Sequence, residues 1–209
     1  MNLSLLLFLP IALSATLPTF AAVKPVVYPF GGTDYRYEPL TDKVRGGNSE
    51  ASCDTIQSYG LVMIAEVYSL PGLSGPVGFA QCRLEKDSRL APNGEGFAFR
   101  VRSNRSDLKF QFLISTPESR RAGFEYEASF TAGLRDNLVP LRWTDFVPVR
   151  RGKQVISAPA LQIADLTNFR WGFQLARGSQ SAAIRGQAEP ISFVLTVGDH
   201  FAKSEPVLH

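Results

Sequence analysis

The chain has 209 residues, of which 44% are hydrophobic and 20% charged, and its net charge is +3. This composition is typical of one globular domain and excludes a disordered or collagen-like chain. Its two histidines, His200 and His209, lie at the C-terminal end, where chains fray, so a histidine-based triad or a multi-histidine metal site is disfavoured. We expect no enzyme, no cofactor and no metal.

Residues 1–21 have the features of a secretory signal peptide. Met1 to Ala22 carry no charge, and the apolar stretch from Leu3 to Ala15 is followed by Thr19-Phe20-Ala21, a small-x-small ending that predicts cleavage before Ala22. A mitochondrial presequence is disfavoured because the first basic residue is Lys24, whereas an uncleaved helix or anchor stays open. No later segment has the ~20 apolar residues of a transmembrane helix. We expect an exported protein (periplasmic, lumenal or extracellular) without a membrane span after cleavage.

The expected compartment predicts the oxidation state of the two cysteines. In an exported protein, Cys53 and Cys82 are predicted to bond to each other, and no CxxC or Cys/His cluster accompanies them to favour zinc. Closing a loop of this length stabilises a fold by about 3–4 kcal/mol in the chain-entropy model.

From Leu61 onward, apolar residues recur with a period of two, which predicts strands rather than helices. We expect an all-β fold of about eight or more antiparallel strands, a sandwich or a barrel, in a single domain over residues 22–209. Residues 22–59 are predicted to be an irregular wrap and residues 60–198 to hold the main strands. The candidate strands are 61–68, 77–84, 97–102, 110–114, 124–131, 138–147, 169–176 and 191–197.

Four stretches in order resemble the complex I intermediate-associated protein 30 family. Residues 42–49, DKVRGGNS, are similar to its D-x-V-M-G-G-x-S signature, and residues 78–80 to its G-F-A step. Residues 94–102 resemble its G-L-x-L-R-V-R strand, and residues 143–152 its segment that begins with Trp and ends in P-x-x-R-G. Arg45 stands where the family usually has Met.

The resemblance implies a galactose-binding-domain-like jelly-roll β-sandwich without established catalytic residues. Its founding members are mitochondrial factors that assist assembly of respiratory complex I, and others act in photosystem biogenesis. Because the leader lacks arginine, this assembly role is not transferred whole.

The glycine-rich loop is the first candidate site. Consecutive glycines allow positive φ and expose N–H groups to a ligand or partner, but a tight turn before the first strand is the alternative. The loop residues are Asp42, Gly46, Gly47, Asn48 and Ser49.

A polar sheet face is the second candidate. Segment 100–153 holds eleven Lys and Arg against six Asp and Glu, and Glu125 and Glu127 share the polar side of their strand. Arg100, Arg102 and Gln111 are expected to be cross-strand partners of the two glutamates, and opposite charges across a sheet contribute about 0.2–1 kcal/mol each. This is therefore either a solvated, salt-bridged face or the concave binding face of the jelly roll. The candidate binding residues are Arg100, Arg102, Gln111, Glu125 and Glu127.

Glycoside hydrolysis by Glu125 and Glu127 is disfavoured because the sequence supplies neither a pocket nor a cause for one raised pKa. Two non-enzymatic functions remain. The first is a protein-binding, assembly-factor-like module, whose partners include membrane-complex subunits. The second is a secreted carbohydrate-binding module, in which Trp143 is the sugar-stacking candidate and Trp171 belongs to the core. Nucleic acid is excluded as a partner because no basic stripe alternates with exposed aromatic residues.

Overall fold

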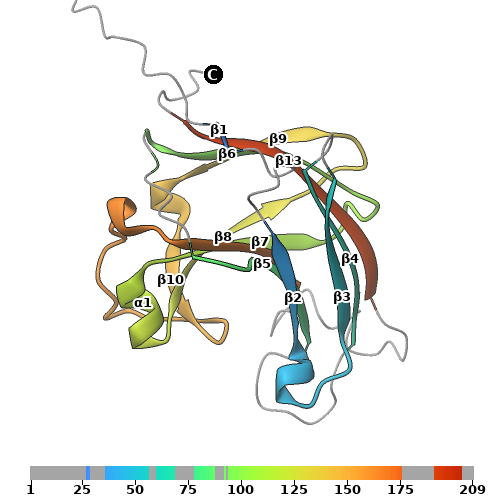
Figure 1. Ribbon diagram of the computed structural model, residues 1–209, viewed down its shortest axis with the longest axis horizontal. Helices are drawn as coiled ribbons and strands as arrows, with labels where there is room; N and C mark the ends of the chain where they lie inside the picture. The colour runs from blue at the N-terminus through green and yellow to red at the C-terminus, as the bar shows by residue number, and fades with distance from the viewer. Residues whose placement is uncertain are drawn as a thin grey trace, which may run out of the picture.

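The computed structural model describes residues 27–28, 36–56, 60–68, 78–87, 92, 94–175 and 191–203. These residues form two antiparallel sheets that pack face to face (Figure 1), which confirms the predicted all-β sandwich. The predicted leader, residues 1–21, lies outside the described part, and so does His209. Within the described part, no helix is long and apolar enough to cross a membrane.

The first sheet has six strands in the order β3-β4-β13-β6-β9, with β1 paired to β13. Its strands are β1 (Val27–Tyr28), β3 (Glu50–Ile56), β4 (Gly60–Val67), β6 (Gly96–Ser103), β9 (Asn137–Arg142) and β13 (Ile191–Lys203). The register of β13 on β6 shifts between Val197 and His200, so His200 lies within the strand, after an irregularity.

The second sheet has seven strands in the order β11-β10-β8-β7-β12-β5-β2. These are β2 (Tyr37–Thr41), β5 (Phe79–Leu84), β7 (Lys109–Ser115), β8 (Glu125–Thr131), β10 (Val147–Arg150), β11 (Lys153–Gln154) and β12 (Asn168–Gln174). One α-helix, α1 (Pro117–Ala122), and three 3-10 turns, η1 (Asp42–Arg45), η2 (Trp143–Asp145) and η3 (Ile163–Asp165), complete the described elements.

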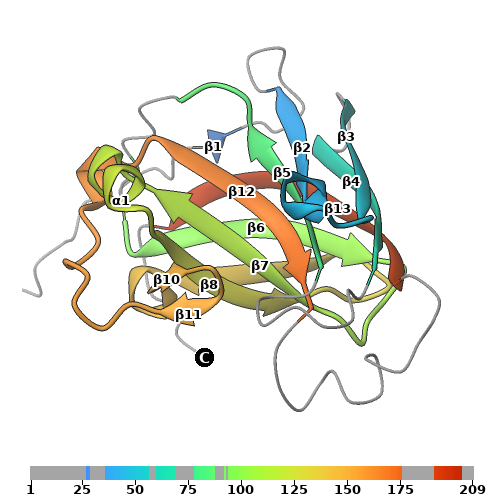
Figure 2. The same ribbon diagram turned by 90° about the horizontal axis from the view of Figure 1, so that it is seen from below.

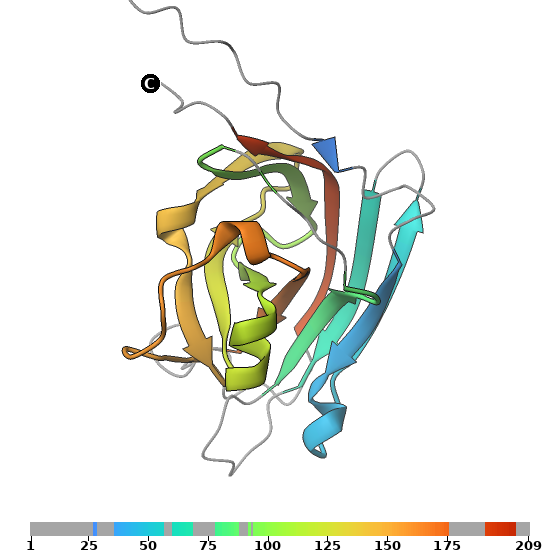
Figure 3. The same ribbon diagram turned by 60° about the vertical axis from the view of Figure 1, so that its left-hand side comes forward.

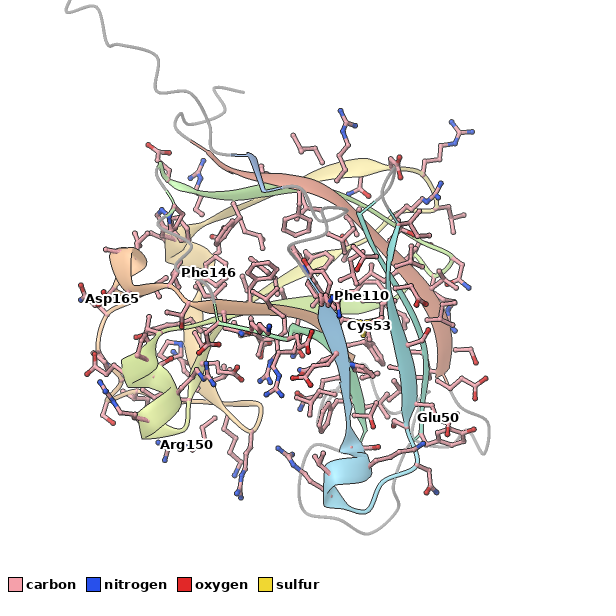
Figure 4. The ribbon with its side chains drawn as sticks, viewed as in Figure 1. Glu50, Cys53, Phe110, Phe146, Arg150 and Asp165 are labelled. Atoms are coloured by element: carbon pink, nitrogen blue, oxygen red, sulfur yellow. A yellow bond between two sulfur atoms is a disulfide. The ribbon has the colours of Figure 1, made fainter. Side chains whose placement is uncertain are left out.

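The core between the sheets is built mainly from aromatic rings. Phe97 and Phe99 of β6 and Phe110 and Phe112 of β7 are at most 1% exposed, because alternate residues of each strand point to the same side. Trp171, predicted to be core, is fully buried and stacks on Phe112 with centroids 4.0 Å apart. Figure 4 shows Phe110 in this layer between the sheets. Truncating such a ring to alanine typically costs about 3–5 kcal/mol.

The predicted disulfide between Cys53 and Cys82 is confirmed. It joins β3 of the six-stranded sheet to β5 of the seven-stranded sheet, with Cα atoms 5.7 Å apart. Near this bond β2 lies beside β3, although the two strands belong to different sheets (Figures 1 and 3). The disulfide therefore links the two layers where the chain passes between them.

Three expectations about local structure were wrong. Residues 22–59 are not all irregular, since β2 and β3 lie within them, one in each sheet. The predicted strand 138–147 is interrupted by η2, and its end joins the other sheet as β10. The short helix α1 was missed, although Thr116 forms a capping box with Ser119 and Pro117 opens the helix.

Candidate functional site

The outer side of the seven-stranded sheet carries charged and polar side chains from most of its strands. It faces away from the six-stranded sheet, and Figure 2 looks onto it. Because neighbouring residues of a strand alternate sides, the residues between the core positions of β2, β5, β7, β8 and β12 point outward here. This polar face consists of Glu38, Gln81, Arg83, Lys109, Gln111, Leu113, Glu125, Glu127, Ser129, Arg170, Gly172 and Gln174.

One row of the polar face places two arginines side by side. Arg83 of β5 is the register partner of Arg170 of β12, and Glu38 of β2 is the partner of Arg83 on its other side. Like charges directly opposite each other on neighbouring strands are destabilising. The sheet therefore holds an unfavourable pair of charges at this position.

Each of these two arginines also has a carboxylate partner. Arg170 forms an ion pair with Glu125, whose side chain is 26% exposed against 16% for Arg170. The Nε of Arg83 donates to Oε1 of Glu38 at 2.9 Å. Burial, and then the charges of Arg83 and Arg45, lower the pKa of Arg170 to about 10, so its guanidinium stays protonated at neutral pH.

Glu127 and Gln111 form a second contact on this face, a hydrogen bond rather than an ion pair. The Nε2 of Gln111 donates to Oε1 of Glu127 at 2.8 Å. Burial raises the pKa of Glu127, while the hydrogen bond from Gln111 and the charge of Lys109 oppose that rise. The expectation that neither carboxylate has a cause for a raised pKa was therefore wrong.

Two buried polar atoms of the polar face have no hydrogen-bond partner among the described residues. They are Oε1 of Gln111 and Nε of Arg170. Leaving such an atom unpaired costs stability, and most buried polar atoms in proteins are paired. The polar face is therefore not arranged for maximum stability, which is a feature of functional surfaces.

Two segments flank the polar face. On one side, the guanidinium of Arg45 in η1 lies 5.3 Å from the ring centre of Phe79. On the other side, the β10–β11 hairpin turns through Arg151 and Gly152, both at positive φ. A Cβ atom on Gly152 would lie 2.8 Å from Nε2 of Gln174, so the hairpin tip reaches the polar face. Figure 1 shows α1 and this hairpin on one side and η1 on the other.

The hairpin is also attached to the helix beside it. Arg150 donates through Nε to the carbonyl of Gly123 at 3.2 Å and through its terminal nitrogen to that of Ala122. These are free carbonyls at the end of α1, where a cation is favourable. Figure 4 labels Arg150 at this position.

The structure separates the predicted binding residues into two groups. Gln111, Glu125 and Glu127 lie on the polar face, but Arg100 and Arg102 belong to β6 and point outward from the opposite sheet. The prediction that these arginines pair with the two glutamates across one sheet was therefore wrong. The cause is connectivity, because β6 pairs with β13 and β9 rather than with β8.

Trp143 lies in η2 at the edge of the core. Its Nε1 donates to the carbonyl of Gly94 at 2.6 Å, and its ring meets Phe97 edge-on with centroids 4.9 Å apart. The indole is partly buried, and its N–H group is already hydrogen-bonded within the chain. These contacts oppose its predicted role as a sugar-stacking platform.

The glycine-rich loop satisfies its own polar groups. The buried carboxylate of Asp42 accepts from the amide and the hydroxyl of Ser49, each at 2.9 Å. Gly46 has a φ of 81° at the end of η1, and a Cβ atom on Gly47 would lie 2.2 Å from the Asp42 carboxyl carbon. Of the five loop residues, Gly46 and Asn48 are exposed, and Asp42, Gly47 and Ser49 are buried. This geometry agrees with the alternative of a tight turn, which in the structure leads from η1 into β3.

Four residues of the site were missed from the sequence. Glu38, Arg83 and Arg170 stand at polar positions of alternating strands, so the pattern predicts that they point outward, but not toward which partners. Arg45 was noted only as a departure from the family signature. No cluster of three His, Cys, Asp or Glu residues that could hold a metal occurs in the part of the chain that the structure describes.

The fold is a two-sheet β-sandwich that carbohydrate-binding modules share. It is similar to the family 11 carbohydrate-binding module of Clostridium thermocellum in complex with a β-1,3-1,4-mixed-linked tetrasaccharide, with a TM-score of 0.57, 12% identity and coverage of 88% of this chain and 98% of that one. A second structure, the family 11 module of the cellulosomal cellulase Lic26A-Cel5E from the same organism, gives a TM-score of 0.57 at 11% identity over 90% and 100% of the two chains. At these identities the likeness concerns the fold alone.

The sequence identifies the family more narrowly. Residues 33–194 match the model of the family described as complex I intermediate-associated protein 30, and the chain belongs to this family. A search among curated proteins finds none that matches.

Proposed function

We propose that the protein is a non-enzymatic binding module with an assembly-factor-like role, which captures a protein partner on the polar face. The observation that carries this proposal is the paired but imperfectly satisfied set of arginines and glutamates on that face, around Arg170. An arrangement that lowers stability is retained where a partner uses it. The family's description, which names a protein associated with an intermediate of a larger complex, supports a protein partner.

The described residues also favour a protein partner over a sugar. Sugar-binding faces commonly offer an open ring, and Phe79, the aromatic residue at the edge of the polar face, is only 6% exposed. The guanidinium of Arg45 covers that ring. Trp143 packs against Phe97 at the edge of the core, as described above.

Glycan binding is the second candidate, because the fold is shared with modules that include a tetrasaccharide complex. Under either candidate we propose an exported location. The disulfide between Cys53 and Cys82 supports it, since such bonds persist mainly in oxidising compartments.

A crosslinking pull-down from a native membrane extract of the source organism tests the proposal. The bait is the full protein as wild type, as S129Y and as S192Y. Ser129 is exposed on the polar face, and Ser192 is exposed on the outer side of the opposite sheet, so the two variants add the same bulk to opposite faces. We expect S129Y to lose a partner that wild type and S192Y retain.

Equal capture by S129Y and wild type would exclude the polar face as the docking surface. The same three proteins on a glycan array test the second candidate. A glycan signal that S129Y abolishes, without any captured protein, would replace the first candidate by the second.

A further inference from the structure

We infer that the polar face binds an acidic peptide segment of the protein partner, with Arg45, Arg83 and Arg170 receiving its carboxylates. This inference rests on the proposed function and names the chemistry of the partner.

Three guanidinium groups lie along this part of the face. Arg83 and Arg170 are register partners on neighbouring strands. Arg45 extends from η1 over Phe79, which lies on the same strand as Arg83. It is close enough that its charge, like that of Arg83, acts on Arg170.

The carboxylates on the face form ion pairs with only two of these three cations. Glu38 pairs with Arg83, and Glu125 pairs with Arg170. Glu127 is hydrogen-bonded to Gln111 instead. Among the described residues, no ion pair joins Arg45 to a carboxylate, so its guanidinium is the member of the cluster without a carboxylate partner.

Together with the basic residues at its border, the face has more positive than negative side chains. Lys109 lies on β7, and Arg151 and Lys153 lie on the β10–β11 hairpin, whose Gly152 approaches Gln174. The side chains of these three basic residues are exposed. A surface with one predominant sign of charge attracts and orients a partner of the opposite sign.

The chemistry of arginine favours carboxylates as the groups to be bound. A guanidinium is a planar fork of donors that matches a carboxylate with two parallel hydrogen bonds. Since Arg45 covers Phe79, the face offers the ligand a cation where a sugar would need an open ring. An acidic peptide satisfies this arrangement, because it brings carboxylates and needs no stacking platform.

Fluorescence anisotropy with a labelled hexaglutamate peptide tests the inference on the full protein. We compare wild type, R45Q/R83Q and the matched control R100Q/R102Q, which removes two arginines from the opposite sheet. The charge change is the same in both double variants. We expect R45Q/R83Q to bind about tenfold more weakly, the loss of roughly one charge-assisted contact, and the control to stay within about twofold of wild type.

Single variants R45Q and R83Q keep the test interpretable if the double variant is unstable, and each should show part of the loss. An equal loss in both double variants would overturn the inference, because net charge alone would then explain binding. Binding of a galacturonate oligosaccharide without hexaglutamate binding would overturn it in favour of an acidic glycan. If neither probe binds while S129Y still loses the native partner, the acidic segment is refuted and the proposed function stands.

Discussion

Replacing Arg170 by alanine should destabilise the fold by about 3 kcal/mol, because Glu125 would be left without its partner. Both side chains are mostly buried, at 16% and 26% exposure. Removing one member of a buried pair typically costs about 3–5 kcal/mol, and the residual exposure places this pair at the lower end. On the opposite sheet, Arg102 lies 3.8 Å from Asp136 with side chains 48% and 57% exposed, so R102A should cost about 0–1 kcal/mol.

Urea unfolding at neutral pH, followed by circular dichroism, measures these differences. About 3 kcal/mol corresponds to a Tm lowered by roughly 6–12 °C for a domain of this size. A variant without either charge, R170M/E125Q, should recover most of the loss, since no carboxylate is left unpaired. The reasoning fails if R170A is no less stable than R102A, or if the double variant is as unstable as R170A.

Three further outcomes follow from the structure. Thiol titration of the denatured, unreduced protein should find no free thiol on Cys53 or Cys82, and reductant should lower the free energy of unfolding by about 3–4 kcal/mol, an effect absent in C53A/C82A. Gly47→Ala should cost about 2 kcal/mol or more in urea unfolding, because its Cβ would overlap the Asp42 carboxylate, and an unchanged midpoint would contradict this packing. The raised pKa of Glu127 means that its contribution to stability is present below its unfolded pKa, near 4.5, and is lost as pH rises through the folded pKa. E127Q should therefore match wild type at pH 4 and be more stable at pH 7; a gap that is the same at both pH values would refute this.

The strands themselves were accessible from the sequence because alternation is a local property. Strand β8, with Tyr126, Ala128 and Phe130 buried, follows the pattern read from residues 124–131. The disulfide was predicted by compartment and count, since only two cysteines were available. The helix α1 was not predicted, because six residues are too few to show the apolar stripe of an amphipathic helix.

The sequence by itself determined the all-β class, the family and the outward direction of most site residues, because period-two patterning and short motifs depend only on neighbours along the chain. Only the tertiary structure decided which strands pair. It placed Arg100 and Arg102 on one sheet and Glu125 on the other, and it brought Arg45, Arg83 and Arg170 together from three distant segments. Strand order in a sandwich depends on contacts between residues far apart in sequence, which alternation within one strand does not encode.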